Sequence, residues 1–305
     1  MQGHGGQVFY SSREQASVII WCERRKISSK LVLSVNTHQM MNKPAVLLST
    51  AAFSLVAAGF GIRSLSRGGS ISISRRAVSS STCSLSGSTL TYFPIPALGE
   101  PARLCLALGG VDFVDERLPG AMFRERKQTF PFQQMPVLTL ADGRKLTQCR
   151  AIARLAAKSA TVDGKPLYPL DDDYVAFLID ETVDAVMDIQ QQMSKTFNLD
   201  EEEKAAARRN LFKEGGFAYV KTCSFDAYLK RQDTDWAVCN HMTIADIFVF
   251  TIFNTFRSGF LDNIDPEFLS AFPSIGRVVA KVASHALVRE YYSAKTESIY
   301  DCFKV

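Results

Sequence analysis

The order of strand-like and helix-like segments between residues 88 and 165 restricts this chain to very few small folds. Residues 89–93 are rich in β-forming side chains and run into two closely spaced prolines, which predicts a strand followed by a loop. Residues 100–108 open with an acid and a proline and stop at two glycines, which predicts a helix. Residues 111–118 alternate between apolar and polar side chains, so a second strand follows.

The second half of this segment predicts two strands and a helix. Pro136 opens a strand over residues 136–140, a position that a proline can occupy without removing a ladder hydrogen bond. Residues 141–144, Ala-Asp-Gly-Arg, signal a tight hairpin turn, and a strand and a helix from Cys149 to about Lys158 follow. The complete order, βαβ and then ββα, is the thioredoxin-like α/β arrangement.

The rest of the chain, residues 171–305, shows helical patterns only. An acidic run at 171–173 opens a long helix, and a further helix with alternating charges is expected from Asn198 towards Leu229. Thr243 and Asp246 have the spacing of an N-terminal capping box, in which both residues serve folding. The last two helices are expected to begin at Pro273 and Leu287.

The 87 residues before this body have a different composition. Residues 1–88 contain ten Lys or Arg and only two acids, whereas the remainder carries 25 basic and 29 acidic residues. The basic surplus therefore lies in the leader, and the mildly acidic body gives no electrostatic reason to expect nucleic-acid binding.

The leader itself resembles a targeting sequence. An uncharged apolar run over residues 44–62 precedes a stretch rich in serine, glycine and arginine. This pattern is typical of bipartite plastid leaders, with a mitochondrial leader as the nearest rival, and either would be cleaved. The alternative is a mis-annotated start or disordered extension, which would leave the protein cytoplasmic. All these readings expect residues 1–87 to add nothing to the folded core, and no stable membrane association of the mature protein.

Cysteine and histidine usage excludes several kinds of site. The seven cysteines are odd in number and show no Cys-x-x-Cys or short Cys/His spacing, so neither a disulfide framework nor a metal site is expected. Only two of the four histidines, His241 and His285, lie in the folded part, which offers no Ser-His-Asp arrangement. The body is therefore suited to a reducing compartment.

Four motifs together give a specific resemblance. Their order and spacing are similar to those of cytosolic glutathione S-transferases of the tyrosine classes sigma, mu, alpha and pi, nearest to sigma. The similarity spans residues 88–305 and implies a thioredoxin-like domain over 88–165 and an all-helical domain over 171–305. The motifs are Leu90–Phe93, Glu100–Arg103, Phe132–Leu138 and Leu146–Leu155.

The resemblance implies glutathione as co-substrate and assigns roles to individual residues. Tyr92 would be catalytic, donating its phenolic hydrogen to the glutathione sulfur. Met135, before a cis Pro136, would pair with the cysteinyl backbone of glutathione like an added strand. Asp184 would reach the glutamyl amine bound by a partner subunit, which implies a homodimer. The remaining glutathione contacts would come from Lys127, Gln134, Gln148 and Cys149.

The sequence departs from the family pattern at three places. Cys149 replaces a serine, and a thiol is the poorer hydrogen-bond donor, so we expect weakened glutathione affinity. Phe123 replaces a tryptophan whose N–H contacts the glycyl carboxylate. Pro96 and Leu98 stand where related enzymes carry arginines, so we expect Tyr92 to act without an arginine nearby.

The function that follows is conjugation of glutathione to small hydrophobic electrophiles, or reduction of organic peroxides. One alternative is a glutathione-dependent isomerase of the prostaglandin D synthase type, which would use the same Tyr92. The other is a non-catalytic ligand-binding or structural relative, favoured by the departures from the family pattern. The electrophile would bind between the domains, near Tyr92, Pro94 and residues 187–193.

Overall fold

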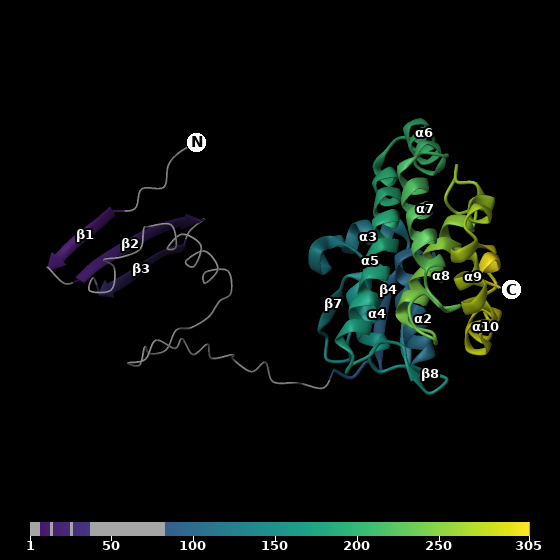
Figure 1. Cartoon of the computed structure of the whole chain (residues 1–305), viewed down its shortest axis with the longest axis horizontal. Coiled ribbons are helices and arrows are strands. Elements are labelled where there is room, and N and C mark those ends of the chain that lie inside the picture. The colour runs from purple at the N-terminus through teal and green to yellow at the C-terminus, as the bar shows by residue number, and fades with distance from the viewer. Residues whose placement is uncertain (1–6, 13–14, 25–26, 37–82, 305) are drawn as a thin grey trace. The chain divides into compact units, whose positions relative to one another are not determined.

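The computed structural model describes residues 7–12, 15–24, 27–36 and 83–304, and the chain divides into two units, residues 1–81 and 82–305. The first unit contains a three-stranded antiparallel sheet in the order β1-β2-β3 (Figure 1). Its strands are β1 (Gln7–Ser12), β2 (Gln15–Arg24) and β3 (Ile27–Asn36). Most of the predicted leader, including its apolar run, lies outside the described residues.

The second unit opens with a four-stranded mixed sheet in the order β5-β4-β6-β7. The central strand β4 is parallel to β5 and antiparallel to β6, and β6 forms the predicted hairpin with β7. Helices α2 and α4 pack against each other beside this sheet, so the predicted thioredoxin-like order is confirmed. The elements are β4 (Ser88–Tyr92), α2 (Glu100–Leu108), β5 (Phe113–Arg117), α3 (Gly120–Arg126), β6 (Val137–Thr139), β7 (Lys145–Thr147) and α4 (Cys149–Ala157).

The core of this domain is formed by apolar side chains from β4, β6, α2 and α4, among them the fully buried Leu90, Leu104 and Leu138. Leu85 is also buried in this core. The expectation that residues up to 87 contribute nothing to the core is therefore wrong at Leu85, because the chain packs against the body just before β4 begins.

The remaining helices form the predicted all-helical domain (Figure 1). They are α5 (Asp173–Ser194), α6 (Glu201–Phe212), α7 (Phe217–Lys230), α8 (Ile244–Arg257), α9 (Pro273–Ser284) and α10 (Ala286–Ser293). A small hairpin, β8 (Thr161–Val162) with β9 (Lys165–Pro166), joins the two domains. A 3-10 turn, η7 (Ser298–Phe303), ends the described chain. None of the helices in the described ranges combines the length and hydrophobicity that crossing a bilayer requires.

One predicted helix is divided in two. The single helix expected from Asn198 towards Leu229 is broken between α6 and α7 at two glycines. Gly215 adopts a left-handed φ of 76°, and a Cβ at Gly216 would collide with the carbonyl oxygen of Asn210. The charge pattern ran through this break, but the backbone there needs residues without a side chain.

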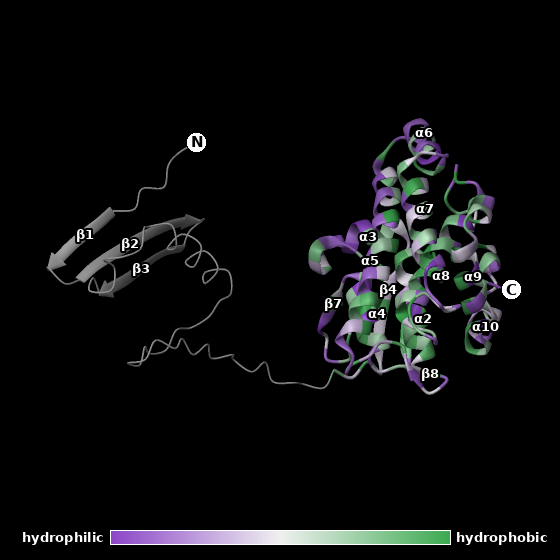
Figure 2. Ribbon diagram, in the orientation of Figure 1, coloured by the Kyte–Doolittle hydropathy of each residue, from purple (hydrophilic) through white to green (hydrophobic). Residues whose placement is uncertain are grey.

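Helix α8 is the centre of the helical domain. Every residue from Ile244 to Phe256 is buried, and α8 packs against α2, α5 and α9. Figure 2 shows hydrophobic residues in green along the helices of this domain. Thr243 and Asp246 form a capping box at its start. The carboxylate of Asp246 accepts hydrogen bonds from the backbone N–H groups of Ala237 (2.6 Å) and Thr243 (2.8 Å). Burial raises the pKa of this carboxyl to about 6, although these hydrogen bonds act in the opposite direction.

Replacing this buried carboxylate should destabilise the whole domain. Asp246→Ala leaves two buried N–H groups without acceptors, so we expect a loss of about 3 kcal/mol in the free energy of unfolding, measured by urea denaturation. Asp265→Ala is the matched control, because Asp265 caps an exposed turn with one bond to the N–H of Glu267 and should cost about 1 kcal/mol or less. Equal losses for the two variants would contradict the role given to Asp246.

Candidate functional site

The register of the sheet brings three predicted site segments to one edge. Thr91 pairs with Val137, and Val137 pairs with Thr147. The residues that follow or precede these partners, Tyr92, Pro136 and Gln148, therefore lie side by side where β4 ends, β6 begins and α4 starts. The strand pairing alone brings Tyr92 beside Pro136 and Gln148, both of which lie more than forty residues further along the chain.

Tyr92 is enclosed at this edge. Its side chain is 5% exposed and its hydroxyl oxygen accepts a hydrogen bond from the backbone N–H of Leu98 at 3.3 Å. Burial raises the pKa of the hydroxyl well above its ordinary value, so the group keeps its proton at neutral pH and remains a donor. Gly99 lies against the ring, where a Cβ would come 2.5 Å from Cδ1 of Tyr92. The loop after β4 thus wraps closely around the tyrosine.

The side chain of Arg103 forms hydrogen bonds with the backbone of this loop. Its fully buried guanidinium donates from Nη1 to the carbonyl of Ile95 (2.8 Å) and from Nη2 to the carbonyl of Phe93 (3.1 Å). Its central carbon lies 5.6 Å from the centroid of the Tyr92 ring. One side chain on α2 therefore fixes the path of the residues that surround the tyrosine.

The expectation that no arginine lies near Tyr92 is consequently wrong. The positions of Pro96 and Leu98 are indeed apolar, but Arg103 reaches back to the same loop from the first turns of α2. Its charge is offset by Glu100 (3.1 Å) and Asp115 (2.8 Å). The sequence signal was the Glu100-x-x-Arg103 spacing in an otherwise apolar helix, which places opposite charges on one face.

The Met135–Pro136 peptide bond is cis, and Met135 precedes β6. Within residues 83–304, neither the backbone N–H nor the carbonyl of Met135 takes part in a hydrogen bond. The Met135 side chain is buried against Tyr92 in a small apolar cluster, while Gln134 is extended and exposed. An unpaired backbone beside a sheet is the requirement for adding an extended peptide.

The start of α4 supplies a candidate anion site. Gln148 is exposed and has a left-handed φ of 73°, which turns the chain sharply into the helix. Cys149 is the first helical residue and is 9% exposed. Burial raises the pKa of its thiol to about 11, so the thiol is neutral at physiological pH and does not repel a carboxylate. The first backbone amides of α4 point out of the helix, as an anion requires.

Lys127 and Phe123, the two positions compared with the family's contacts to the glycyl carboxylate of glutathione, lie in different surroundings. Lys127 is exposed at the beginning of a 3-10 turn that follows α3. Phe123 packs edge-to-face on Phe93 at 5.3 Å and stacks with Phe130 at 6.1 Å. Its ring is part of the aromatic packing around the loop that surrounds Tyr92 and offers no N–H donor.

Asp184 lies on α5 and is exposed. Its carboxylate forms an ion pair with Arg150 of the same chain, the residue that follows Cys149. Asp184 is thus held beside the start of its own α4. Its contribution to a site on a partner subunit remains a prediction.

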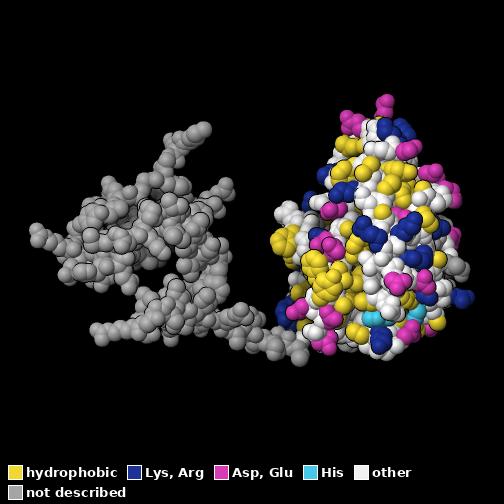
Figure 3. All heavy atoms as spheres, viewed as in Figure 1, with side chains coloured by type: hydrophobic (Ala, Val, Ile, Leu, Met, Phe, Trp, Pro, Cys, Tyr) yellow, Lys and Arg dark blue, Asp and Glu magenta, His cyan; other side chains and the backbone are white. Residues whose placement is uncertain are grey.

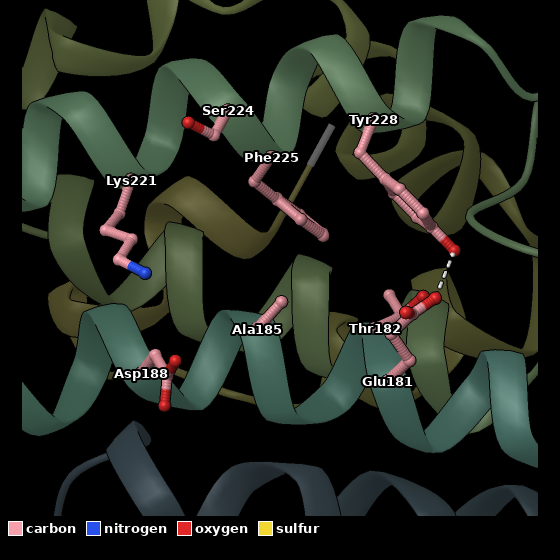
Figure 4. Close-up of a pocket in the computed structure, with 8 residues that line it drawn as sticks. All are labelled: Glu181, Thr182, Ala185, Asp188, Lys221, Ser224, Phe225 and Tyr228. Atoms are coloured by element: carbon pink, nitrogen blue, oxygen red, sulfur yellow. Dashed lines mark hydrogen bonds between the residues drawn. The ribbon is translucent and has the colours of Figure 1, made fainter.

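The cavity drawn in Figure 4 lies between α5 and α7 and has a volume of about 240 Å3. The hydroxyl of Tyr228 crosses its end and donates to Glu181. The lining is mixed in character. Of the residues expected around the electrophile pocket it includes Asp188 of the 187–193 segment but neither Tyr92 nor Pro94. It is lined by Glu181, Thr182, Ala185, Asp188, Lys221, Ser224, Phe225 and Tyr228.

No cluster of three or more potential metal ligands occurs among the described residues.

Known proteins share both the sequence pattern and the fold. The family described as "Glutathione S-transferase, C-terminal domain" matches residues 187–295. Glutathione S-transferase 3 of Caenorhabditis elegans is 32% identical over 165 residues, which cover 52% of this chain and 75% of the relative. Probable glutathione S-transferase 7 of the same organism is 28% identical over 207 residues, covering 68% of this chain and 95% of the relative.

Solved structures agree on the fold. Prostaglandin synthase D of Nilaparvata lugens superposes with a TM-score of 0.59 at 24% identity, over 69% of this chain and 99% of that one. The sigma class enzyme of Fasciola hepatica gives a TM-score of 0.57 at 22% identity, over 70% and 99%. From these relatives and the thioredoxin-like and helical domains that they share with it, the chain belongs to the glutathione S-transferase family.

Proposed function

We propose that this protein is a glutathione transferase that conjugates the thiolate of glutathione to small hydrophobic electrophiles. The observation that carries the proposal is the position of the Tyr92 hydroxyl, which is buried and protonated at the sheet edge where the backbone of Met135 forms no hydrogen bond with residues 83–304. A tripeptide added along Met135 would bring its cysteine towards Tyr92.

Tyr92 would favour ionisation of the bound thiol. A free thiol has a pKa of about 8.5, so only a small part is thiolate at neutral pH. The N–H of Leu98 already donates to the phenolic oxygen, which strengthens the O–H as a donor to sulfur. The thiol proton leaves to solvent, the sulfur forms a bond to the electrophilic carbon, and the leaving group departs with the bonding electrons.

Glutathione itself would be held along its length. The cysteinyl backbone would pair with Met135, and the γ-glutamyl carboxylate would accept from the amides at the start of α4 beside Gln148 and Cys149. Gln134 and Lys127 are both exposed, and Lys127 would meet the glycyl carboxylate. Binding therefore relies on several groups, whereas thiol activation relies on Tyr92.

The alternatives differ in what they require of these groups. Peroxide reduction and isomerisation of the prostaglandin D synthase type both need the same thiolate, and the fold shared with such a synthase keeps that isomerase as the second candidate. A non-catalytic relative would bind glutathione without activating it. Glutathione binding and turnover of a chlorodinitrobenzene substrate, measured on the same preparation, separate these classes.

Removing the phenolic hydroxyl should affect chemistry more than binding. We expect Tyr92→Phe to lower kcat/KM for conjugation about 100-fold, because a single donor to a developing anion has effects of this size. The dissociation constant of glutathione, from calorimetry, should change by less than about threefold. The control is Tyr219→Phe, whose ring packs on Phe272 in the helical domain. If wild type and Tyr92→Phe turn over at the same slow rate, the catalytic assignment is withdrawn.

Restoring a hydroxyl at the start of α4 should strengthen glutathione binding. Cys149→Ser replaces a weak donor by a strong one at the proposed carboxylate site, so we expect the dissociation constant to fall about fivefold, which corresponds to one moderate hydrogen bond. Cys223→Ser, at an exposed position on α7, is the matched control and should leave it unchanged. Weaker binding by Cys149→Ser would place the γ-glutamyl carboxylate elsewhere.

We also infer a homodimer in which Asp184 contacts glutathione bound by the partner subunit. Three aromatic side chains of the described residues are unusually exposed, Phe132 (74%), Tyr174 (71%) and Phe177 (59%). Figure 3 shows hydrophobic side chains gathered on the face that carries α5 in Figure 1. Such surfaces usually mark association.

Sedimentation should give twice the mass of one chain, and Asp184→Asn should weaken glutathione binding about fivefold through loss of a charged contact. Asp188→Asn, one turn further along α5 and also exposed, should bind as wild type does. A monomeric protein whose affinity is insensitive to Asp184 would exclude the shared site.

A further inference from the structure

The carboxylate of Glu100 is fully buried and surrounded by donors from the end of the chain. Its Oε1 accepts from the hydroxyls of Tyr292 (3.0 Å) and Tyr291 (3.4 Å). Its Oε2 accepts from Tyr300 (3.3 Å) and from the guanidinium of Arg103 (3.1 Å). Three tyrosines from α10 and η7, almost two hundred residues away in sequence, thus satisfy one carboxylate at the start of α2.

Tyr300 also links the ion pair of Glu100 and Arg103 to a second ion pair, between Arg117 and Asp115. Its hydroxyl oxygen accepts from Nη1 of Arg117 (2.8 Å), and Nε of Arg117 donates to Asp115 (2.7 Å). Asp115 in turn accepts from Nε of Arg103 (2.8 Å). Two arginines and two carboxylates therefore form a closed, charge-balanced ring in which the Tyr300 hydroxyl is the bridging neutral group.

This ring continues directly to the loop around Tyr92. Arg103 donates to the carbonyls of Phe93 and Ile95, and the N–H of Leu98, a few residues on, donates to the Tyr92 hydroxyl. Arg103 therefore fixes the backbone at the start of this loop, and Leu98 near its end contacts the hydroxyl of Tyr92. Buried polar networks of this kind fix one geometry only when every member is satisfied.

We propose that Tyr300, in the last turn of the chain, is a positioning residue that aligns the Tyr92 hydroxyl through Glu100, Arg103 and the loop of residues 93–98. Without the Tyr300 hydroxyl, Nη1 of Arg117 loses its acceptor and Oε2 of Glu100 keeps only Arg103. Arg103 then moves towards Glu100 and away from the loop carbonyls. This inference rests on the proposed function for its catalytic consequence, but its structural part is independent of it.

The test is Tyr300→Phe in the full chain, with Tyr228→Phe as the matched control, since Tyr228 also donates to a carboxylate at 3.3 Å but from α7. Hydrogen exchange of the Leu98 amide should become about tenfold faster in Tyr300→Phe because the loop opens more often. The kcat for conjugation should fall about fivefold, with KM for glutathione within about twofold, because alignment acts on the transition state. The pKa of the bound thiol, followed by ultraviolet absorbance, should rise.

The outcomes separate the two proposals. If wild type neither binds nor conjugates glutathione, the proposed function fails, while exchange at Leu98 still tests the contact chain. Unchanged exchange at Leu98 and an unchanged pKa of the bound thiol in Tyr300→Phe overturn the inference. Should Tyr300→Phe lose its cooperative unfolding transition, Arg117→Lys, at a partly exposed position, releases the same hydroxyl and must give the same changes for the inference to stand.

Discussion

The buried guanidinium of Arg103 is the group on which the rest of the candidate site at this sheet edge depends. It is placed where the loop after β4, strand β5 and the start of α2 meet, and it donates in each of these directions at once. A planar fork of five donors can do this, whereas a lysine ammonium could not reach carbonyls and carboxylates on opposite sides. Glu100 and Asp115 balance its charge, so the protein avoids the cost of an unpaired buried ion.

Much of the candidate site was predictable because its determinants are local. Strand propensities, the prolines and the hairpin turn define β4, β6 and β7, and pairing of these strands then places Tyr92, Met135 and Gln148 at one edge. The capping residues Thr243 and Asp246 act within one turn of helix. Each of these features is determined by a short stretch of sequence, so the sequence was sufficient to predict it.

The remaining features depend on contacts that no local pattern encodes. The hydrogen bonds from Tyr292 and Tyr300 to Glu100 join residues about two hundred positions apart, and aromatic residues in α10 and η7 give no sign of which carboxylate they will meet. The break at Gly215 was hidden by a charge pattern that continued across it. The cation beside Tyr92 comes from Arg103 on α2, whereas the nearby loop positions Pro96 and Leu98 are apolar.

The docking of η7 has a consequence for the order in which the protein folds. Tyr300 is buried and forms hydrogen bonds with Glu100 and Arg117 of the first domain, about two hundred positions earlier in the chain. The contacts between the sheet and α2 span short loops, whereas the contact between Glu100 and Tyr300 closes a very long one and carries its entropy cost. The ion cluster beside Tyr92 is therefore completed only after the helical domain has folded back onto α2.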